Sequence, residues 1–99
     1  FDKGVGVSFF PIKLFFIKNS EKQRSNVTFT VGKKNLGSAV DRNKTKRLMR
    51  EVFRLNFQEK SEFLGRSLVF VYLGKDVTSF ESIEKGFFGV FKKFISKKN

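Results

Sequence analysis

The sequence predicts a single α+β domain built as a two-layer α/β sandwich. Three observations predict it: the chain opens with segments of alternating apolar and polar residues, two amphipathic helical patterns follow, and an apolar run separates those helices. A chain of 99 residues can form one small hydrophobic core and is too short for two. Residues 1–99 are therefore expected to form one domain.

The first extended segment runs from Val7 to Ile17, and its residues alternate between two sets. One set is wholly apolar and is expected in the core, whereas the other is mixed. The apolar set is Phe10, Ile12, Leu14 and Phe16, and the mixed set is Phe9, Pro11, Lys13, Phe15 and Ile17. Because proline has no N–H to donate, Pro11 marks an edge, a bulge or a break between two short strands.

Two further strands are predicted, one on each side of a long helix. Asn26 to Lys33 alternates in the same way, and the polar connection before it suggests a hairpin with the first segment. Ser67 to Leu73 is an apolar run, as expected of a central strand that is buried on both faces. Because a strand, a helix and a strand make a β-α-β unit, these two strands are predicted to be parallel in one sheet.

The long helix carries the most informative pattern in the chain. At 3.6 residues per turn, its basic side chains fall within an arc of about 140° and its apolar side chains fall on the other side. Ser38, followed three residues later by Asp41, is the predicted N-cap. The basic side comprises Arg42, Asn43, Lys46, Arg47, Arg50 and Arg54, and the expected core side comprises Leu48, Met49, Val52, Phe53 and Leu55.

A last helix is predicted to start at Thr78, because Glu81 three residues later completes a capping box. Apolar residues then recur at helical spacing and are expected to cover the sheet. Gly86 and Gly89 permit a close approach to that sheet. The recurring apolar residues are Phe80, Ile83, Phe87, Val90, Phe91, Phe94 and Ile95.

The charge of the chain points to a polyanionic partner. The formal net charge is +12 and the isoelectric point is about 10.3. Residues 33–54 alone hold eight basic and two acidic side chains, so half of the excess is local. Lys33 and Lys34 lie just before the helix, where unpaired backbone N–H groups favour anion binding.

Several classes of function are disfavoured by composition. Cysteine and histidine are absent, which excludes disulfides and the usual zinc sites and removes the commonest general base near neutral pH. The acidic residues are scattered, so no catalytic residue and no metal ligand is assigned. No run approaches the ~18 apolar residues of a membrane span, and no leader pattern is present, so the protein is expected to be cytoplasmic.

Two features allow more than one interpretation at this level. On the mixed face of the first segment, one interpretation is that another element covers Phe9, Phe15 and Ile17. The other is a partly open groove in which Lys13 meets a phosphate and Phe15 stacks on a base. The basic side of the long helix is either a solvated surface or a docking surface for RNA. The last helix could also lie on a membrane surface, a weaker possibility.

The long helix and its approach, residues 37–51, also carry a family signature. The pattern is a triplet, one residue, a basic pair, two residues and an arginine: Arg42-Asn43-Lys44, Lys46-Arg47 and Arg50. It resembles the signature of the bacterial ribonuclease P protein component, which reads Arg-Asn-Arg, one residue, Lys-Arg, two residues and Arg. The strand at 27–31, the basic loop after it and the apolar run at 68–72 follow in the family's order. The resemblance covers essentially the whole chain.

The resemblance implies a specific version of the predicted fold. It is a two-layer sandwich like domain 2 of ribosomal protein S5, with a helix, three strands, the signature helix, a strand and a last helix. It also implies a left-handed β-α-β crossover, although such units are right-handed in about 98% of cases. Only Phe1 to Gly4 resembles the family's first helix, as its last turn, so this N-terminal helix is expected to be largely missing.

The resemblance further implies a function. Family members bind the catalytic ribonuclease P RNA and the 5′ leader of precursor tRNA, and the RNA carries the chemistry with Mg²⁺. No protein partner is required and no membrane is involved. The residues implied in binding the RNA subunit are Lys33, Lys34, Arg42, Asn43, Lys44, Lys46, Arg47 and Arg50. The residues assigned to the leader cleft are Phe1, Lys13 and Phe15, of which Phe1 and Phe15 match aromatic positions of the family.

The chain departs from the family pattern at two further positions. Lys44 replaces the second arginine of the triplet, which keeps the charge and loses planar, two-pronged phosphate recognition. Leu73 stands where an arginine often ends the strand, with Lys75 as a substitute close by. The alternative function is that of a non-catalytic structural RNA-binding protein, such as a small ribosomal protein.

Overall fold

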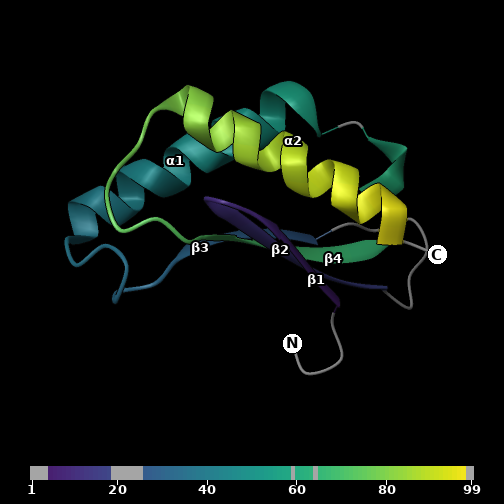
Figure 1. The fold of residues 1–99 in the computed structure, drawn as a ribbon, viewed down its shortest axis with the longest axis horizontal. Helices are drawn as coiled ribbons and strands as arrows, with labels where there is room; N and C mark the ends of the chain where they lie inside the picture. The colour runs from purple at the N-terminus through teal and green to yellow at the C-terminus, as the bar shows by residue number, and fades with distance from the viewer. Residues whose placement is uncertain (1–4, 19–25, 59, 64, 98–99) are drawn as a thin grey trace.

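The computed structural model describes residues 5–18, 26–58, 60–63 and 65–97. Within these ranges the chain forms one β-sheet, and two α-helices lie across the same face of it (Figure 1). This arrangement confirms the predicted two-layer α+β fold. The elements are β1 (Val5–Phe9), β2 (Ile12–Lys18), β3 (Asn26–Val31), α1 (Ala39–Asn56), a 3₁₀ helix (Ser61–Phe63), β4 (Arg66–Tyr72) and α2 (Phe80–Lys97).

The sheet has the strand order β1-β2-β4-β3. β3 and β4 are parallel neighbours joined through α1, which confirms the predicted β-α-β unit. β2 and β3 are not paired, so the predicted hairpin between these segments is wrong. β4 lies between them instead, antiparallel to β2. An alternating pattern shows which face of a strand is buried but does not show which strand lies beside it. The left hand of the crossover stays a prediction from the resemblance.

Pro11 confirms the predicted break between two short strands. β1 and β2 pair antiparallel, and Phe10 and Pro11 form the turn between them. The break also shifts the alternation: Val7 points into the core from β1, whereas Phe10 is 71% exposed in the turn. The expectation that Phe10 is core is therefore wrong. Ile12 and the following inward residues of β2 are buried as predicted.

β4 is central, as predicted, but only one of its faces is buried. Leu68, Phe70 and Tyr72 are buried beneath the helices, while Val69 and Val71 remain partly exposed on the other face. The prediction of burial on both faces is wrong because both described helices lie over the same side of the sheet. The sheet thus has a covered face and an open face.

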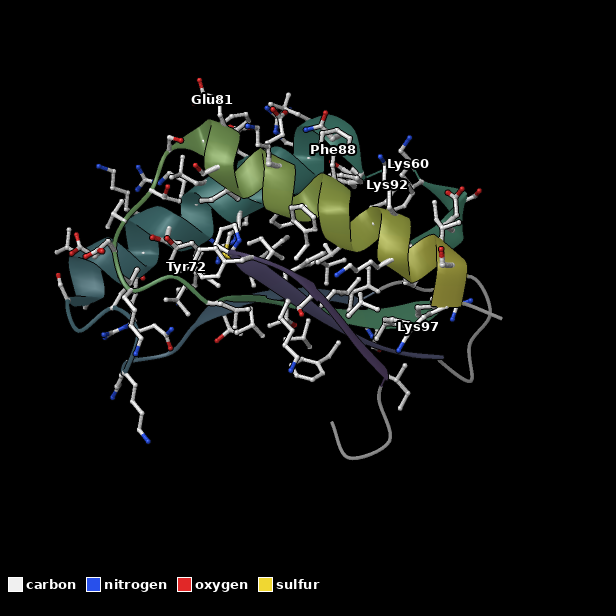
Figure 2. The ribbon with its side chains drawn as sticks, viewed as in Figure 1. Lys60, Tyr72, Glu81, Phe88, Lys92 and Lys97 are labelled. Carbon is white, nitrogen blue, oxygen red and sulfur yellow. The ribbon has the colours of Figure 1, made fainter. Side chains whose placement is uncertain are left out.

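Many phenylalanine rings pack between the helices and the sheet, together with aliphatic side chains (Figure 2). The Phe70 and Phe87 rings stack with centroids 4.6 Å apart, and Phe16 meets Phe94 edge to face at 4.7 Å. Each fully buried ring of this kind stabilises the fold by roughly 2 kcal/mol. The high phenylalanine content therefore serves mainly to join the two layers.

The predicted N-cap of α1 is confirmed, because the Asp41 N–H donates to the Ser38 hydroxyl at 3.4 Å. Met49 and Val52 are buried as predicted, but Leu55 is 57% exposed. Thr45 takes a place on the buried side, and its hydroxyl has no partner among the described residues. The core side of α1 is therefore rotated away from Leu55 and toward Thr45.

α2 begins slightly later than predicted, because Ser79 rather than Thr78 accepts a hydrogen bond from the Ser82 N–H, at 3.2 Å. Most of its predicted core residues are buried, but Ile95 is 42% exposed. No helix among the described residues combines the length and apolar character needed to cross a membrane.

The two glycines of α2 lie against the β1–β2 hairpin, as their predicted role requires. A Cβ on Gly86 would lie 2.7 Å from Ile12 Cγ1 and 3.0 Å from Pro11 Cδ, and one on Gly89 would overlap the Phe9 ring. Neither Ile12 nor Pro11 can move easily, since both are buried. The absence of side chains at these positions sets how closely α2 approaches the sheet.

We expect Gly86→Ala to lower the free energy of unfolding by about 1–3 kcal/mol, because the added methyl group overpacks the contact with Ile12. Denaturant unfolding of the purified protein measures it. The matched control is Gly37→Ala, since a Cβ there meets no atom within 4 Å, and it should change stability by less than about 0.5 kcal/mol. Equal stability of both variants would contradict the close-approach role of Gly86.

Candidate nucleic-acid interface

The residues of the predicted signature gather on the side of α1 that faces away from the sheet. Asn43, Lys44, Arg47 and Arg50 are exposed, and Lys46 is half-buried. We call these five residues together with Arg42 the signature face. The structure thus brings six of the residues predicted to bind the RNA subunit together on one helix whose other side is buried, whereas Lys33 and Lys34 lie in the loop before it.

Arg42 differs from the other cations of the signature face. It is half-buried, and its Nη1 donates to the carbonyl oxygens of Leu36 and Gly37 at 2.8 and 3.0 Å. These bonds join the start of α1 to the loop before it. Arg42 therefore fixes the shape of the basic loop, in addition to any contact with a ligand.

The cationic character of α1 weakens toward its C-terminal end. Arg54 Nε donates to Glu51 Oε1 at 2.7 Å, and the two side chains form an ion pair on the exposed side of the helix. This pairing offsets the charge of Arg54. The region of unopposed positive charge therefore runs from the helix start to Arg50.

The basic loop between β3 and α1 is tied to the loop that follows β4. Asn35 N donates to Gly32 O at 3.0 Å to form a turn, and Asn35 Nδ2 donates to Leu73 O at 3.0 Å. Because β3 and β4 are parallel, their following loops meet at one edge of the sheet beside the start of α1. Exposed Lys33, Lys34 and Lys75 therefore lie on neighbouring loops next to the signature face.

Asn35 was not identified from the sequence as a functional residue. Its only sequence signal is that asparagine often makes local hydrogen bonds in turns. The Tyr72 hydroxyl holds the other loop, since it donates to Asp76 O. Burial and then the nearby Asp76 carboxylate raise the pKa of Tyr72 above its ordinary value. The tyrosine thus stays neutral and able to donate at physiological pH.

The second predicted site lies on the open face of the sheet. Lys13 and Phe15 point away from the helices on β2, because the alternating Leu14 and Phe16 are buried beneath them. Lys13 Nζ lies 4.8 Å from the centroid of the Phe15 ring. Both side chains are half-buried, and neither described helix covers them. The interpretation of Phe15 as a residue under another element is therefore wrong for these helices.

Small and aliphatic residues lie beside Lys13 and Phe15 on the neighbouring strands β1 and β4. A Cβ on Gly6, opposite Phe15 on β1, would lie 3.3 Å from the ring. Across β2, Phe15 and Lys13 are in register with Val69 and Val71 of β4. This part of the sheet face presents an aromatic ring beside a cation, the two groups that single-stranded RNA binders use. Phe1, the third predicted residue of this cleft, and the rest of residues 1–4 lie outside the described residues.

The described residues contain no group of three or more histidine, cysteine, aspartate or glutamate side chains that could hold a metal ion. We assign no catalytic residue to the described surface. Its chemistry is that of cations, an amide and an aromatic ring, which can bind and orient a polyanion.

Comparison with known proteins finds one family that matches the chain. The family model described as Ribonuclease P matches residues 1–95. The ribonuclease P protein component of Finegoldia magna is 30% identical over 93 residues, which cover 94% of this chain and 80% of that protein. The corresponding protein of Chlorobaculum tepidum is 54% identical over 44 residues, which cover 44% of this chain and only 26% of that protein.

Solved structures agree with the sequence comparison. The RNase P protein of Staphylococcus aureus matches with a TM-score of 0.76 and 29% identity, covering 97% of this chain and 84% of that one. The RNase P protein from Thermotoga maritima matches with a TM-score of 0.74 and 26% identity, covering 93% of this chain and 84% of that one. The similarity thus extends over nearly the whole fold.

We expect Arg42→Ala to lower the free energy of unfolding by about 1 kcal/mol in the absence of RNA, because two loop carbonyls lose a charged donor in a partly exposed setting. Arg50→Ala removes an exposed side chain and should change stability by less than about 0.5 kcal/mol. Denaturant unfolding compares the two variants. Identical stabilities would show that the Arg42 hydrogen bonds do not hold the loop.

Proposed function

Because the chain belongs to the ribonuclease P protein family, we propose that it is the protein subunit of that ribonucleoprotein. In this role it binds the catalytic RNA subunit and the 5′ leader of precursor tRNA, and it promotes endonucleolytic removal of the leader to give the mature 5′ end. The single observation that carries the proposal is the pairing of two different surfaces on one small domain: the signature face on α1 and the aromatic, cationic spot on the open sheet face.

The signature face suits the RNA subunit. Arg47 and Arg50 are exposed guanidinium groups, which can donate two parallel hydrogen bonds to a phosphate. The adjoining basic loop adds Lys33 and Lys34, so cations line both the start of α1 and the sheet edge beside it. Such a surface follows the shape of a folded RNA backbone and needs no base-specific contact.

The open sheet face suits a single-stranded leader. Phe15 offers a ring on which an unpaired base can stack, and the Lys13 ammonium 4.8 Å from the ring centroid can meet the adjacent phosphate. Stacking tolerates different bases because every base has a π face. This arrangement fits a substrate class whose leaders differ in sequence.

The catalytic groups in this proposal belong to the RNA. The chain has no cysteine and no histidine, and its acidic residues are scattered. Mg²⁺ would be held by the RNA subunit and the substrate and would supply Lewis-acid chemistry there. The protein contributes binding and orientation. The proposal also places the protein in the cytoplasm, requires no protein partner and involves no membrane.

We expect the protein to raise the rate at which its cognate RNA subunit cleaves precursor tRNA at low Mg²⁺, because bound cations on the protein lower the repulsion between two RNAs. Single-turnover cleavage with and without protein measures the effect. Unchanged cleavage would contradict the proposal and favour a structural RNA-binding protein, such as a small ribosomal protein.

Arg50→Ala and Lys85→Ala provide matched variants for this assay, since each removes one exposed cation from a helix. Arg50→Ala should weaken binding of the protein to the RNA subunit and reduce the slope of log affinity against log salt by about 1. Lys85→Ala, on α2 and off the signature face, should leave both quantities nearly unchanged. Equal losses would indicate diffuse electrostatic attraction.

We expect Phe15→Ala to reduce the preference of the holoenzyme for precursor over mature tRNA by about 1–3 kcal/mol, because one base loses its stacking partner. Phe10→Ala is the matched control, since it removes the same ring from an exposed turn outside the open face. Binding constants for precursor and mature tRNA give the preference. An equal effect of the two variants argues against a stacking role, and unfolding curves report whether Phe15→Ala remains folded.

A further inference from the structure

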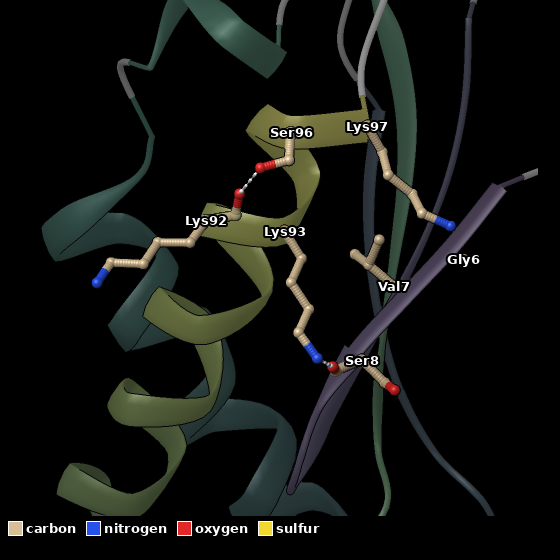
Figure 3. A pocket seen from close by; sticks show the side chains of 7 residues that line it. All are labelled: Gly6, Val7, Ser8, Lys92, Lys93, Ser96 and Lys97. Carbon is tan, nitrogen blue, oxygen red and sulfur yellow. Dashed lines mark hydrogen bonds between the residues drawn. The ribbon is translucent and has the colours of Figure 1, made fainter.

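A shallow groove of about 480 Å³ lies between the edge strand β1 and the C-terminal part of α2 (Figure 3). Neither the signature nor the predicted leader residues include any part of it. None of its lining residues is acidic. The lining residues are Gly6, Val7, Ser8, Lys92, Lys93, Ser96 and Lys97.

The lysines of the groove differ in where their ammonium groups lie. Lys93 Nζ donates to the backbone oxygen of Ser8 at 2.7 Å, so its cation is held against the edge strand. Lys97 extends toward Gly6 and Val7, whereas Lys92 points to the other side of α2 (Figures 2 and 3). Lys97 therefore provides an exposed cation at the strand edge, and Lys93 provides a second one that is fixed in place.

The groove adjoins the open face of the sheet. Gly6 lines the groove, and on the open face the same residue lies beneath the Phe15 ring and the Lys13 stem. Because Gly6 has no side chain, nothing at this position of β1 rises between the Phe15 ring and the groove. A strand that stacks on Phe15 can pass over the edge of the sheet at Gly6 and reach the cations of α2.

We propose that this groove binds the phosphate backbone of single-stranded leader RNA beyond the nucleotides that contact Phe15. The inference rests on the proposed function, since it extends the path of the same strand. The chemistry of the lining supports a polyanion: it offers two ammonium groups directed at the strand edge and no carboxylate to repel phosphate. No aromatic residue lines the groove, so it offers no stacking surface for a base. It would therefore bind phosphates without a preference for the base sequence.

A peptide strand is a poorer occupant of the same groove. β1 is an edge strand, and an added peptide would need its outward backbone groups. The Ser8 carbonyl already accepts a hydrogen bond from Lys93. Lysine side chains at a sheet edge commonly disfavour the addition of another strand. The held ammonium group thus disfavours strand addition and leaves its charge available to a phosphate.

The test uses the holoenzyme reconstituted from the protein and its cognate RNA subunit, with precursor tRNAs that carry leaders of about three or about ten nucleotides. We expect Lys97→Glu to weaken binding of the long-leader precursor by about threefold to tenfold, and to leave short-leader binding unchanged. The slope of log affinity against log salt for the long leader should fall by about 0.7 for each phosphate that the protein no longer neutralises.

Lys85→Glu is the matched control, because it makes the same charge change at an exposed site about three turns earlier on α2. It should affect long and short leaders equally. A Lys97→Glu loss that does not depend on leader length, or no loss at all, as expected if a peptide occupies the groove, overturns the inference while the proposed function stands. If the unaltered holoenzyme itself does not prefer precursor over mature tRNA, the proposed function fails, and the inference fails with it.

Discussion

Burial of only one face of the sheet is the constraint on which the rest of the structure depends. Both described helices pack over the same face, where the stacked rings of Phe70 and Phe87 join the layers, and Gly86 lets α2 come close to Ile12. Two 18-residue helices are enough to cover a sheet of this size once. Neither of these helices lies over the opposite face, which presents Lys13 and Phe15.

The sequence patterns predicted the elements well because each element depends on local spacing. The cap of α1 at Ser38 and the break at Pro11 follow from short stretches of chain. The parallel pairing of β3 and β4 follows from the order strand, helix, strand. The misplaced residues depend on distant contacts. Phe10 and Leu55 fit the periodicity of their segments, yet both side chains are exposed, since no described element covers them. Strand order likewise depends on which faces and edges meet in three dimensions.

The candidate site also contains features that the sequence predicts and features that only the fold shows. The signature face was predictable because its residues share one helix, and the structure brings them together as the spacing indicated. The contact of Asn35 with the loop after β4 and the groove beside Lys97 were not predictable, because each involves segments far apart in the chain. The hydrogen bonds from Arg42 to the carbonyls of Leu36 and Gly37 are local, but they depend on the shape of a loop that has no regular spacing. In each case the residue type indicated which interactions the side chain could make, and only the fold showed which groups it contacts.

Strand order also explains how one small domain could bind two RNA segments at once. α1 packs over β3 at one edge of the sheet, whereas β1 and the end of α2 form the other edge. The exposed residues of α1 lie on the side of the helix opposite its buried residues, so RNA docked there would not cover Lys13 and Phe15 on the far face of the sheet. A leader that crosses the open face from β2 toward β1 moves away from the signature face and toward Lys93 and Lys97. In the proposed function, two cationic regions at opposite edges of the sheet would hold the phosphates of the two RNA segments apart and so limit the repulsion between them.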